Sequence, residues 1–463
     1  MVYEVDTFDE TRYSIDMSEL LDPILVKTFA ADKRRLANTA VPIITVAGTF
    51  QEDLKRLYGF PNSDKTRDVV FSRAHFSMAV GVAYQAWQDD ISPTKAWVVD
   101  PTNYVSRDDW RKIQLTELVG KTLARRSWLK SVKDIIDQFG RQKLPILDSI
   151  TPPLLHLTED IEKPILCFHI AAGNILATQG KKVVQVVTDP HVRPEYTTNA
   201  HLPNIIFCVF DERTRLEFFE VAAINGVKVR PEKVIVTGPP IDPRIIAARK
   251  HKVAWRSGPL QLGITTGGLG TNSYEIRQLL VQLLPHLRRE PSPYNLVIYA
   301  GTQKDVALMA HQLAKEQHIG VGKDQDRKAK LRILYHPQIL DANELLIRYL
   351  FPWADGIITK PSGDMAYDAV AAGCFLLTLS EWGIWEERIR EIFTQKDIAR
   401  VAEIESIVAQ LSVLQSLDGR QSWVEQAMNH SLGIEKLFLL GSRKILEVLE
   451  ESPTLFSQLK KKA

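Results

Sequence analysis

Residues 356–379, GIITKPSGDMAYDAVAAGCFLLTL, decide the fold of this chain. The stretch opens with an apolar, strand-like run and turns at Lys360–Gly363. It continues as an alanine-rich helical run from Met365 to Ala372 and closes on a second apolar run from Cys374 to Leu379. Strand, turn, helix and strand in this order are typical of a parallel sheet covered by helices. We therefore predict an α/β protein.

A second glycine turn with the same flanks lies earlier in the same half. Alternating apolar residues over 260–264 lead into Gly267-Gly268-Leu269-Gly270, and a run with helical spacing follows from Ile276 to Leu287. Asn272 and Glu275 fit a helix N-cap and its third-position partner. This stretch also predicts a strand, a turn and a helix.

Glycine turns that open a helix can bind phosphate. They present unpaired backbone N–H groups and the positive end of the helix dipole, which are the groups that phosphate oxygens need. Either turn taken alone is more often a tight connection without a ligand. Two such turns in one half favour a single ligand with two anionic or polar ends.

Length, charge and cysteine usage narrow the class of protein. The 463 residues exceed one ordinary core and predict two or three domains, and a net charge of +2 gives no reason to expect nucleic acid. Three scattered cysteines fit neither a metal site nor a disulfide framework, which indicates the cytoplasm. No signal-peptide pattern is seen, and no run approaches the roughly 20 apolar residues of a spanning helix. We expect at most peripheral contact with the inner face of the cell membrane.

Strand-like and helix-like runs alternate along almost the whole chain, which predicts two doubly wound, Rossmann-like domains. Prolines at 239, 240 and 243 interrupt the alternation, and the basic stretch 249–252 follows. We place the boundary there, with an N-terminal domain over 1–245 and a C-terminal domain over 246–463. A ligand would lie in the cleft between them, at the carboxyl ends of the strands. The strands expected in the first half are Val41–Ala47, Asp68–Ser72, Ala96–Asp100, Ile165–Ile170, Val183–Thr188, Ile205–Phe210 and Lys233–Thr237.

Three segments resemble the signature segments of GT-B glycosyltransferases. They are residues 236–244 (VTGPPIDPR), the turn that begins at Gly267, and residues 360–373. The most similar families are the monogalactosyldiacylglycerol synthases and the peptidoglycan N-acetylglucosaminyltransferases, and Thr188-Asp189-Pro190-His191 resembles a Thr-Asp-x-x-x-x-His element of the former with its histidine displaced. The resemblance implies a two-domain GT-B fold. Its C-terminal domain would bind a nucleotide sugar, usually linked to uridine diphosphate, and its N-terminal domain the acceptor.

The resemblance also implies donor-binding positions. Asp368 stands where the family has a glutamate that binds the ribose hydroxyls, and a solvated helix position is the alternative from the residues alone. A Gly-Gln-Glu element that contacts the sugar corresponds to residues 381–387 (EWGIWEE), where Glu386 or Glu387 is the counterpart and the glutamine is missing. The sugar is therefore left open. The positions expected near the diphosphate are Gly268, Gly270, Thr271, Asn272, Ser362 and Gly363.

The candidate general base lies in the first half. Related enzymes have a glycine-rich turn that ends in histidine, and this chain keeps His75 but has Arg73 and Ala74 in place of the glycines. An acceptor hydroxyl must lose its proton, and imidazole titrates in a suitable range, so we assign His75 as the base. Its alternative is a capping or core histidine, and Arg73 could reach a phosphate. Asp189 and His191 are further candidates for the base or for positioning the acceptor.

These assignments predict the chemistry. The enzyme would neutralise a departing diphosphate and orient a hydroxyl at the anomeric carbon. Two helix N-termini would serve the first task, so we expect a metal-independent hexosyltransferase with no cofactor beyond the nucleotide-sugar donor. Residues 110–133 are basic and tryptophan-containing and suit an anionic bilayer, although an ordinary surface helix is the alternative.

Three functions are therefore carried forward. The first is transfer of a hexose or N-acetylhexosamine from a nucleotide sugar to a lipid or glycolipid acceptor. The second is a sugar-nucleotide epimerase or hydrolase, which shares the two-domain architecture. The third is a noncatalytic protein that only binds the sugar nucleotide, for which the missing glycines before His75 are the main support.

Overall fold

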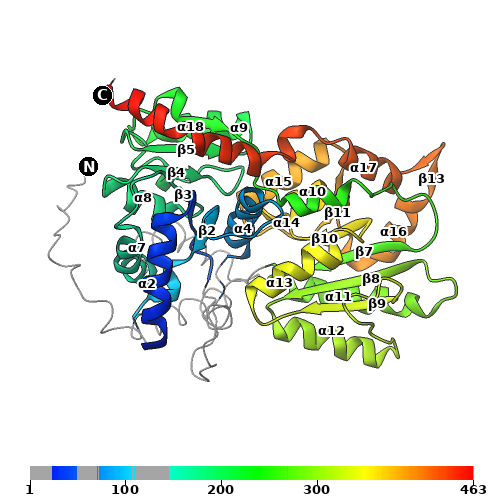
Figure 1. Cartoon of the computed structure of the whole chain (residues 1–463). Coiled ribbons are helices and arrows are strands. Elements are labelled where there is room, and N and C mark those ends of the chain that lie inside the picture. Colours follow the sequence, from blue (N-terminus) through cyan, green and yellow to red (C-terminus); the bar gives the residue numbers. More distant parts are fainter. Residues whose placement is uncertain are drawn as a thin grey trace.

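The computed structural model describes residues 23–48, 70, 72–106, 109, 145–267 and 270–461. Within these ranges the chain forms two six-stranded parallel sheets, one in each half, with helices packed around them (Figure 1). The fold class expected from the alternating runs is confirmed. A small antiparallel hairpin, β13 (Leu417–Asp418) with β14 (Gln421–Ser422), stands apart from both sheets.

The first sheet has the strand order β2-β1-β3-β4-β5-β6, and all its pairs are parallel. Most of its strand residues are apolar and buried, as expected of a sheet with helices on both faces. Its strands are β1 (Val41–Ile44), β2 (Ala96–Val99), β3 (Ile165–Cys167), β4 (Val183–Val186), β5 (Ile205–Val209) and β6 (Val234–Val236). The helices of this half are α2 (Pro23–Asn38), α4 (Arg73–Trp87), α7 (Pro145–Thr158), α8 (Ile170–Thr178) and α9 (Glu212–Ile224).

The second sheet has the order β12-β11-β10-β7-β8-β9 and is also parallel. Its strands are β7 (Leu260–Thr265), β8 (Tyr294–Gly301), β9 (Leu331–Tyr335), β10 (Gly356–Thr359), β11 (Phe375–Thr378) and β12 (Ala399–Val401). The helices that follow the first sheet are α10 (Pro243–Arg249), α11 (Ser273–Leu283), α12 (Lys304–Glu316), α13 (Ile339–Leu345), α14 (Met365–Ala371), α15 (Ile384–Gln395), α16 (Ile407–Gln415), α17 (Trp423–Leu432) and α18 (Gly441–Lys461).

The strand expected at 68–72 has a different role where the structure describes it. Val70 forms only an isolated bridge to Gly48. Ser72 is the N-cap of α4, and its hydroxyl accepts a hydrogen bond from the amide of His75. A serine cap starts a helix because it satisfies an amide that the first turn leaves free. The rest of that stretch lies outside the described residues.

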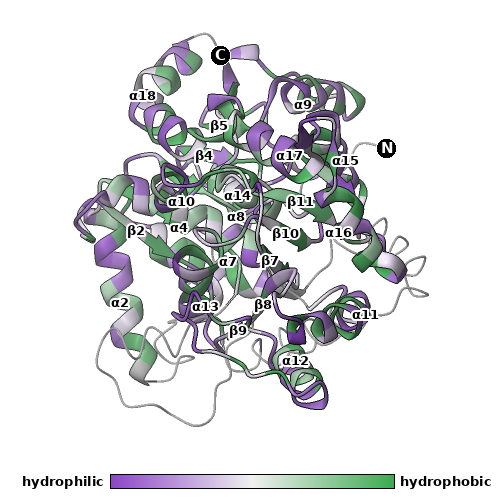
Figure 2. Cartoon of the chain, turned by 90° about the vertical axis from the view of Figure 1, so that its right-hand side faces the viewer, coloured by the Kyte–Doolittle hydropathy of each residue, from purple (hydrophilic) through white to green (hydrophobic). Residues whose placement is uncertain are grey.

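The two halves share a core. One apolar cluster includes Phe168 and Phe210 from the first half together with Tyr367 and Phe393 from the second. Figure 2 shows hydrophobic residues on the inner strands and hydrophilic ones along the outer sides of α12 and α18. Burial of apolar surface between the sheets stabilises the halves against each other.

The proline-rich crossing between the sheets is packed tightly. Gly238 has φ +87°, and both it and Gly441 lie so close to backbone atoms that a β-carbon would overlap them. From this crossing α18 runs back over the first half, where it packs on α4 and β4 (Figure 1). Within the part of the chain that the structure describes, no helix is both long and apolar enough to span a bilayer.

Candidate functional site

The carboxyl ends of both sheets open onto one cavity of about 280 Å³. Parallel sheets bind their ligands at this end because loops and helix starts gather there. Six residues proposed from the sequence line this cavity: His75, Asp189, Thr271, Ser362, Gly363 and Glu386. Residues from both halves, and from both glycine turns, therefore face a single space.

The turn after β7 is shaped by close contacts. The amide of Gly270, which has φ +70°, donates to the carbonyl of Gly267 at 2.8 Å. A β-carbon on Gly267 would lie 2.7 Å from Cε of Lys360 and would overlap the hydroxyl of Thr271. Only glycine lets these two side chains meet over the turn. Gly268, expected against the diphosphate, lies outside the described residues.

Asn272 stands at the start of α11, as the N-cap pattern predicts, with φ +63°. Its side chain caps no backbone amide. Instead it donates to the carboxylate of Glu275 and, at 3.2 Å, to the carbonyl of Ser380. The expected pair is formed through side chains, and it ties the start of α11 to the loop after β11.

The turn after β10 holds a carboxylate of its own. Asp364 is buried, accepts a hydrogen bond from the hydroxyl of Ser362 at 2.8 Å, and forms an ion pair with Arg73 from the other half. Burial would raise the pKa of Asp364, but Arg73, Ser362 and the amide of Met365 outweigh it and lower the pKa. The N-terminus of α14 thus already has an internal anion.

Gly363 brings this turn against the first half. A β-carbon at Gly363 would lie 2.6 Å from Oδ1 of Asp189 and 2.8 Å from the carbonyl oxygen of Thr188. Any larger residue would push the end of β4 away from the turn. The cavity walls are therefore in direct contact at this point.

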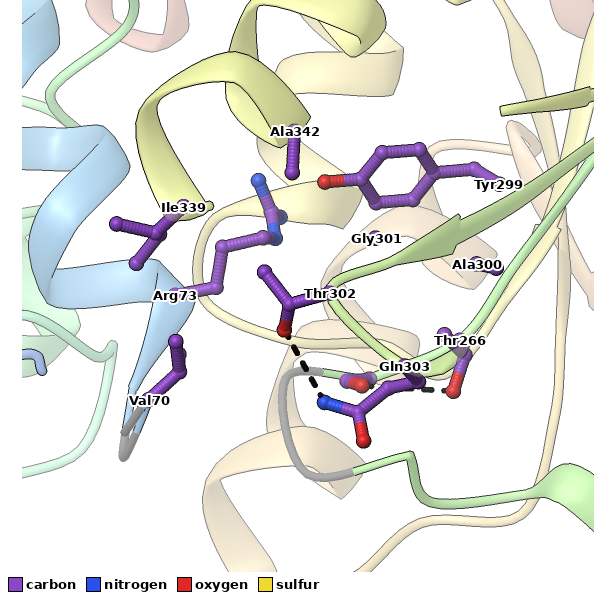
Figure 3. A pocket seen from close by; sticks show the side chains of 11 residues that line it. Val70, Arg73, Thr266, Tyr299, Ala300, Gly301, Thr302, Gln303, Ile339 and Ala342 are labelled. Carbon is purple, nitrogen blue, oxygen red and sulfur yellow. Dashed lines mark hydrogen bonds between the residues drawn. The ribbon is translucent and has the colours of Figure 1, made fainter. Parts of the chain in front are cut away.

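Arg73 lines the main cavity and also a smaller pocket beside it. Figure 3 shows its guanidinium directed from α4 toward the hydroxyl of Tyr299, beside Ile339 and Ala342, in a small pocket of about 10 Å³. Nη1 of Arg73 and the Tyr299 hydroxyl are both buried without a hydrogen-bond partner among the described residues. This volume is at the lower limit for one water molecule. Arg73 lines the main cavity and forms an ion pair with Asp364, and its contact with a phosphate stays a prediction.

Asp368 lies on α14 behind Asp364 and is not among the residues that line the cavity. It is 6% exposed, so the alternative of a solvated helix residue is wrong. Burial, together with the nearby charge of Asp364, raises the pKa of Asp368 well above its usual value. This shift favours the neutral form of the carboxyl group. Its contact with a ribose stays a prediction.

His75 lies at the first-half wall of the cavity and is neutral. Burial lowers its pKa to about 4. Its Nδ1 lies 3.3 Å from the carbonyl oxygen of Val46, and its Nε2 lies 3.2 Å from the hydroxyl of Thr188. A carbonyl only accepts, so the proton belongs on Nδ1 and the lone pair on Nε2 points toward Thr188. An acceptor hydroxyl that transfers its proton to Nε2 would first have to displace the Thr188 hydroxyl from the Nε2 lone pair.

The other two candidates from the first half separate in space. Asp189 lines the cavity, where burial raises its pKa, and its carboxylate lies 3.7 Å from Arg193. His191 is not among the lining residues. Its Nδ1 lies 2.9 Å from Glu217, which also pairs with Arg388 of α15. Of the two, Asp189 is the one that lines the cavity.

The two glutamates left open from the sequence also separate. Glu386 lines the cavity at 1% exposure and pairs with Lys360 at 2.5 Å. Glu387 is exposed, and its described partner is Arg390. Glu386 is therefore the member of the pair that faces the candidate site.

Sequence reasoning missed several lining residues. Lys360 opens the second turn, and Trp382 and Trp385 lie within residues 381–387. Arg193 lines the cavity and stacks over Trp385, with 5.3 Å from its guanidinium carbon to a ring centroid. The signal for Lys360 was its place beside the turn. The signal for the tryptophans was two bulky side chains within four residues, at the start of α15.

Two further expectations concern ligands and membranes. In the described part of the chain, no three His, Cys, Asp or Glu side chains gather closely enough to hold a metal ion. The segment 110–133, expected to suit an anionic bilayer, lies outside the described residues.

Comparison with known proteins identifies the fold. No family model and no curated protein matches the sequence. Among solved structures, α,α-trehalose 6-phosphate synthase from Burkholderia multivorans has 12% identity and a TM-score of 0.53, covering 90% of this chain and 99% of its own. UDP-GlcNAc 2-epimerase from Neisseria meningitidis, bound to UDP-GlcNAc, has 14% identity and a TM-score of 0.50, covering 89% and 100%. MurG from Acinetobacter baumannii has 12% identity and a TM-score of 0.42, covering 89% and 98%. The fold is GT-B, as the resemblance implied.

Proposed function

We propose that the protein is a glycosyltransferase that moves a hexose or N-acetylhexosamine from a nucleotide diphosphate sugar, UDP-linked, to a lipid or glycolipid hydroxyl. The observation that carries this proposal is the common cavity. Two glycine turns of the second half and the candidate base of the first half face the same space, as a donor diphosphate and an acceptor hydroxyl require.

The proposed roles follow the two halves. Residues 246–463 would hold the donor, with the diphosphate at the turn after β7 and at Lys360, and residues 1–245 would hold the acceptor. His75 or Asp189 would take the acceptor proton, because both line the cavity. We propose that neither a metal nor a second cofactor is needed, since Lys360 and the start of α11 offer positive charge for the leaving group.

The proposed acceptor rests on the sequence. Basic residues and tryptophans over 110–133 suit a peripheral position at the cytoplasmic face of an anionic membrane. Adding vesicles with and without anionic phospholipid to the purified protein tests this part alone. Cosedimentation that requires the anionic lipid and falls with salt supports it, and equal recovery in the supernatant contradicts it.

The whole proposal is tested by supplying UDP-, GDP-, dTDP- and ADP-sugars with and without a lipid acceptor. Transfer to the lipid, with nucleotide release that depends on the acceptor, is the expected result. Consumption of the nucleotide sugar without an acceptor would instead favour an epimerase or hydrolase. That second candidate is supported by the similarity in fold to UDP-GlcNAc 2-epimerase. Binding without any turnover would favour a noncatalytic role.

A further inference from the structure

Lys360 occupies a central position on the donor side of the cavity. Its Nζ lies 2.5 Å from Oε1 of Glu386, and the two side chains are 14% and 1% exposed. The other carboxylate oxygen of Glu386 accepts the amide of Trp382 at 2.7 Å. The carboxylate is thus held by two donors, whereas the ammonium group of Lys360 has three N–H bonds and one hydrogen-bond partner among the described residues.

A second polar group meets Lys360 over the first turn. The side chain of Lys360 and the hydroxyl of Thr271 both crowd the face of Gly267 that a β-carbon would fill. Thr271 is 5% exposed and lines the cavity, yet its hydroxyl has no hydrogen-bond partner among the described residues. Leaving a buried hydroxyl unpaired costs free energy, so this position favours a ligand that completes the bond.

We propose that Lys360 and Thr271 bind an oxygen of a diphosphate, and that Glu386 keeps Lys360 in place until the anion shares it. This inference rests on the proposed function, because the anion would be the diphosphate of the donor. Lys360 would use a free N–H bond, and Thr271 would donate its hydroxyl proton. Glu386 has the same sign of charge as the ligand, so it opposes anion binding while it orients the lysine.

The three side chains therefore have different expected effects on one measurement. Removing the charge of Lys360 removes attraction, and removing the hydroxyl of Thr271 removes one hydrogen bond. Neutralising Glu386 removes repulsion and leaves Lys360 unpaired, so the affinity for the anion should rise. A merely structural role for the Lys360–Glu386 pair predicts loss from both changes.

The test is calorimetric titration of the full chain with inorganic pyrophosphate and, separately, with UDP. Lys360→Met and Thr271→Val should each weaken binding of both by about tenfold or more, the range for hydrogen bonds to a charged group. Glu386→Gln should strengthen pyrophosphate binding by about threefold, in the range of a partly screened charge pair. Lys396→Met is the matched control, because Lys396 also pairs with a glutamate, Glu435, at 2.5 Å but outside the cavity.

Three results would overturn the inference. They are unchanged affinity in Lys360→Met, weaker binding in Glu386→Gln, and no binding of either probe by the unaltered protein. If Lys360→Met fails to fold, the opposite shifts expected for Thr271→Val and Glu386→Gln still decide. Pyrophosphate has neither sugar nor nucleoside, so its binding does not require transfer. If the variants change the affinity for pyrophosphate as expected but no sugar is transferred, the proposed function is refuted and the diphosphate-binding site is still supported.

Discussion

The turns after β7 and β10 follow adjacent strands of one sheet, but different side chains surround them. A hydrogen bond of 2.7 Å between the hydroxyls of Thr265 and Thr359 joins the two strand ends. Among the residues that the structure describes, the first turn presents the unpaired hydroxyl of Thr271 to the cavity, and the side chain of Lys360 lies over it from the second turn. The second is occupied by Asp364, which is paired with Arg73 from the other half.

This difference shows that one sequence pattern can serve two purposes. A strand, a glycine turn and a helix create amides that attract an anion. Where a ligand supplies the anion, the turn is a binding site, and where a carboxylate of the chain supplies it, the turn becomes a joint between domains. The identity of the anion, and not the turn itself, decides the role. Four substitutions test this contrast.

The largest effect is expected from Arg73→Met. It leaves the carboxylate of Asp364 buried without its cation, which costs about 3–5 kcal/mol of unfolding free energy. Urea unfolding of the variant and the unaltered protein measures this loss. Arg73→Met combined with Asp364→Asn should recover most of it, because no unpaired charge remains. A loss below about 1 kcal/mol in the single variant, as for an exposed pair, would show that the second turn is not a joint.

Asp368→Ala tests whether the helix after the second turn also contacts the ligand. If Asp368 accepts ribose hydroxyls, the variant should bind UDP about 1.5–3 kcal/mol more weakly and bind pyrophosphate as before. Calorimetry with both ligands measures the difference. Asp368→Asn should preserve stability, because the raised pKa of Asp368 favours its neutral form, and an amide also offers a donor and an acceptor. Equal affinities for UDP in the Ala variant and the unaltered protein would refute the ribose contact.

Gly363→Ala tests the contact of the second turn with the end of β4. The added methyl group would lie 2.8 Å from a backbone oxygen that cannot rotate away, so about 2 kcal/mol of stability should be lost. Thermal and urea unfolding report the change. Gly320→Ala is the control, because a β-carbon there meets nothing within 4 Å. Equal stability of the two variants would mean that the halves are not held together at this point.

The effect that is smallest at neutral pH concerns His75, because it develops only as the pH falls. Its folded pKa of about 4 lies below the ordinary value of 6.5, so the unfolded chain binds the extra proton between these values. The contribution of neutral His75 to the free energy of unfolding is present above pH 6.5 and is lost as the pH falls toward 4. His75→Gln should therefore become more stable relative to the unaltered protein as the pH falls over this range, by about 2–3 kcal/mol at pH 4 and by almost nothing at pH 7.

Urea midpoints of both proteins at several pH values measure that difference. Comparing the two proteins cancels the opposite contributions of other groups, such as Asp32 and Asp100, whose pKa values are raised to about 6. A difference in stability that does not vary between pH 4 and 6.5 would mean that His75 is open to solvent and titrates normally.

The fold could be predicted from the sequence because its signals are local. Apolar strand runs, glycine turns and helical spacing placed both parallel sheets, and the turn at 360–363 follows the end of β10 as expected. The strand predicted at 68–72 was wrong at Ser72, which caps α4. The hydrogen bond from a helix amide to the serine hydroxyl favours a helix start there over a continued strand.

The candidate site was only partly predictable because its pairs are distant in sequence. The sequence does not indicate that Arg73 pairs with Asp364, or which residue pairs with Glu386. For the same reason His191, which follows a strand like Asp189, could not be recognised as a partner of Glu217. Spacing along the chain places side chains at the edge of a sheet, and tertiary packing then decides which of them face the cavity.

The course of α18 has a consequence for biosynthesis. Its apolar side chains, among them Ile445 and Phe456, complete a cluster with residues of β1 and α4, and the carbonyl of Leu459 accepts a hydrogen bond from Arg230. The ribosome synthesises α18 long after β1 and α4. Until then, the apolar surface of the first half that α18 covers is exposed. Chaperones that shield such surfaces would be needed until translation has passed the second sheet.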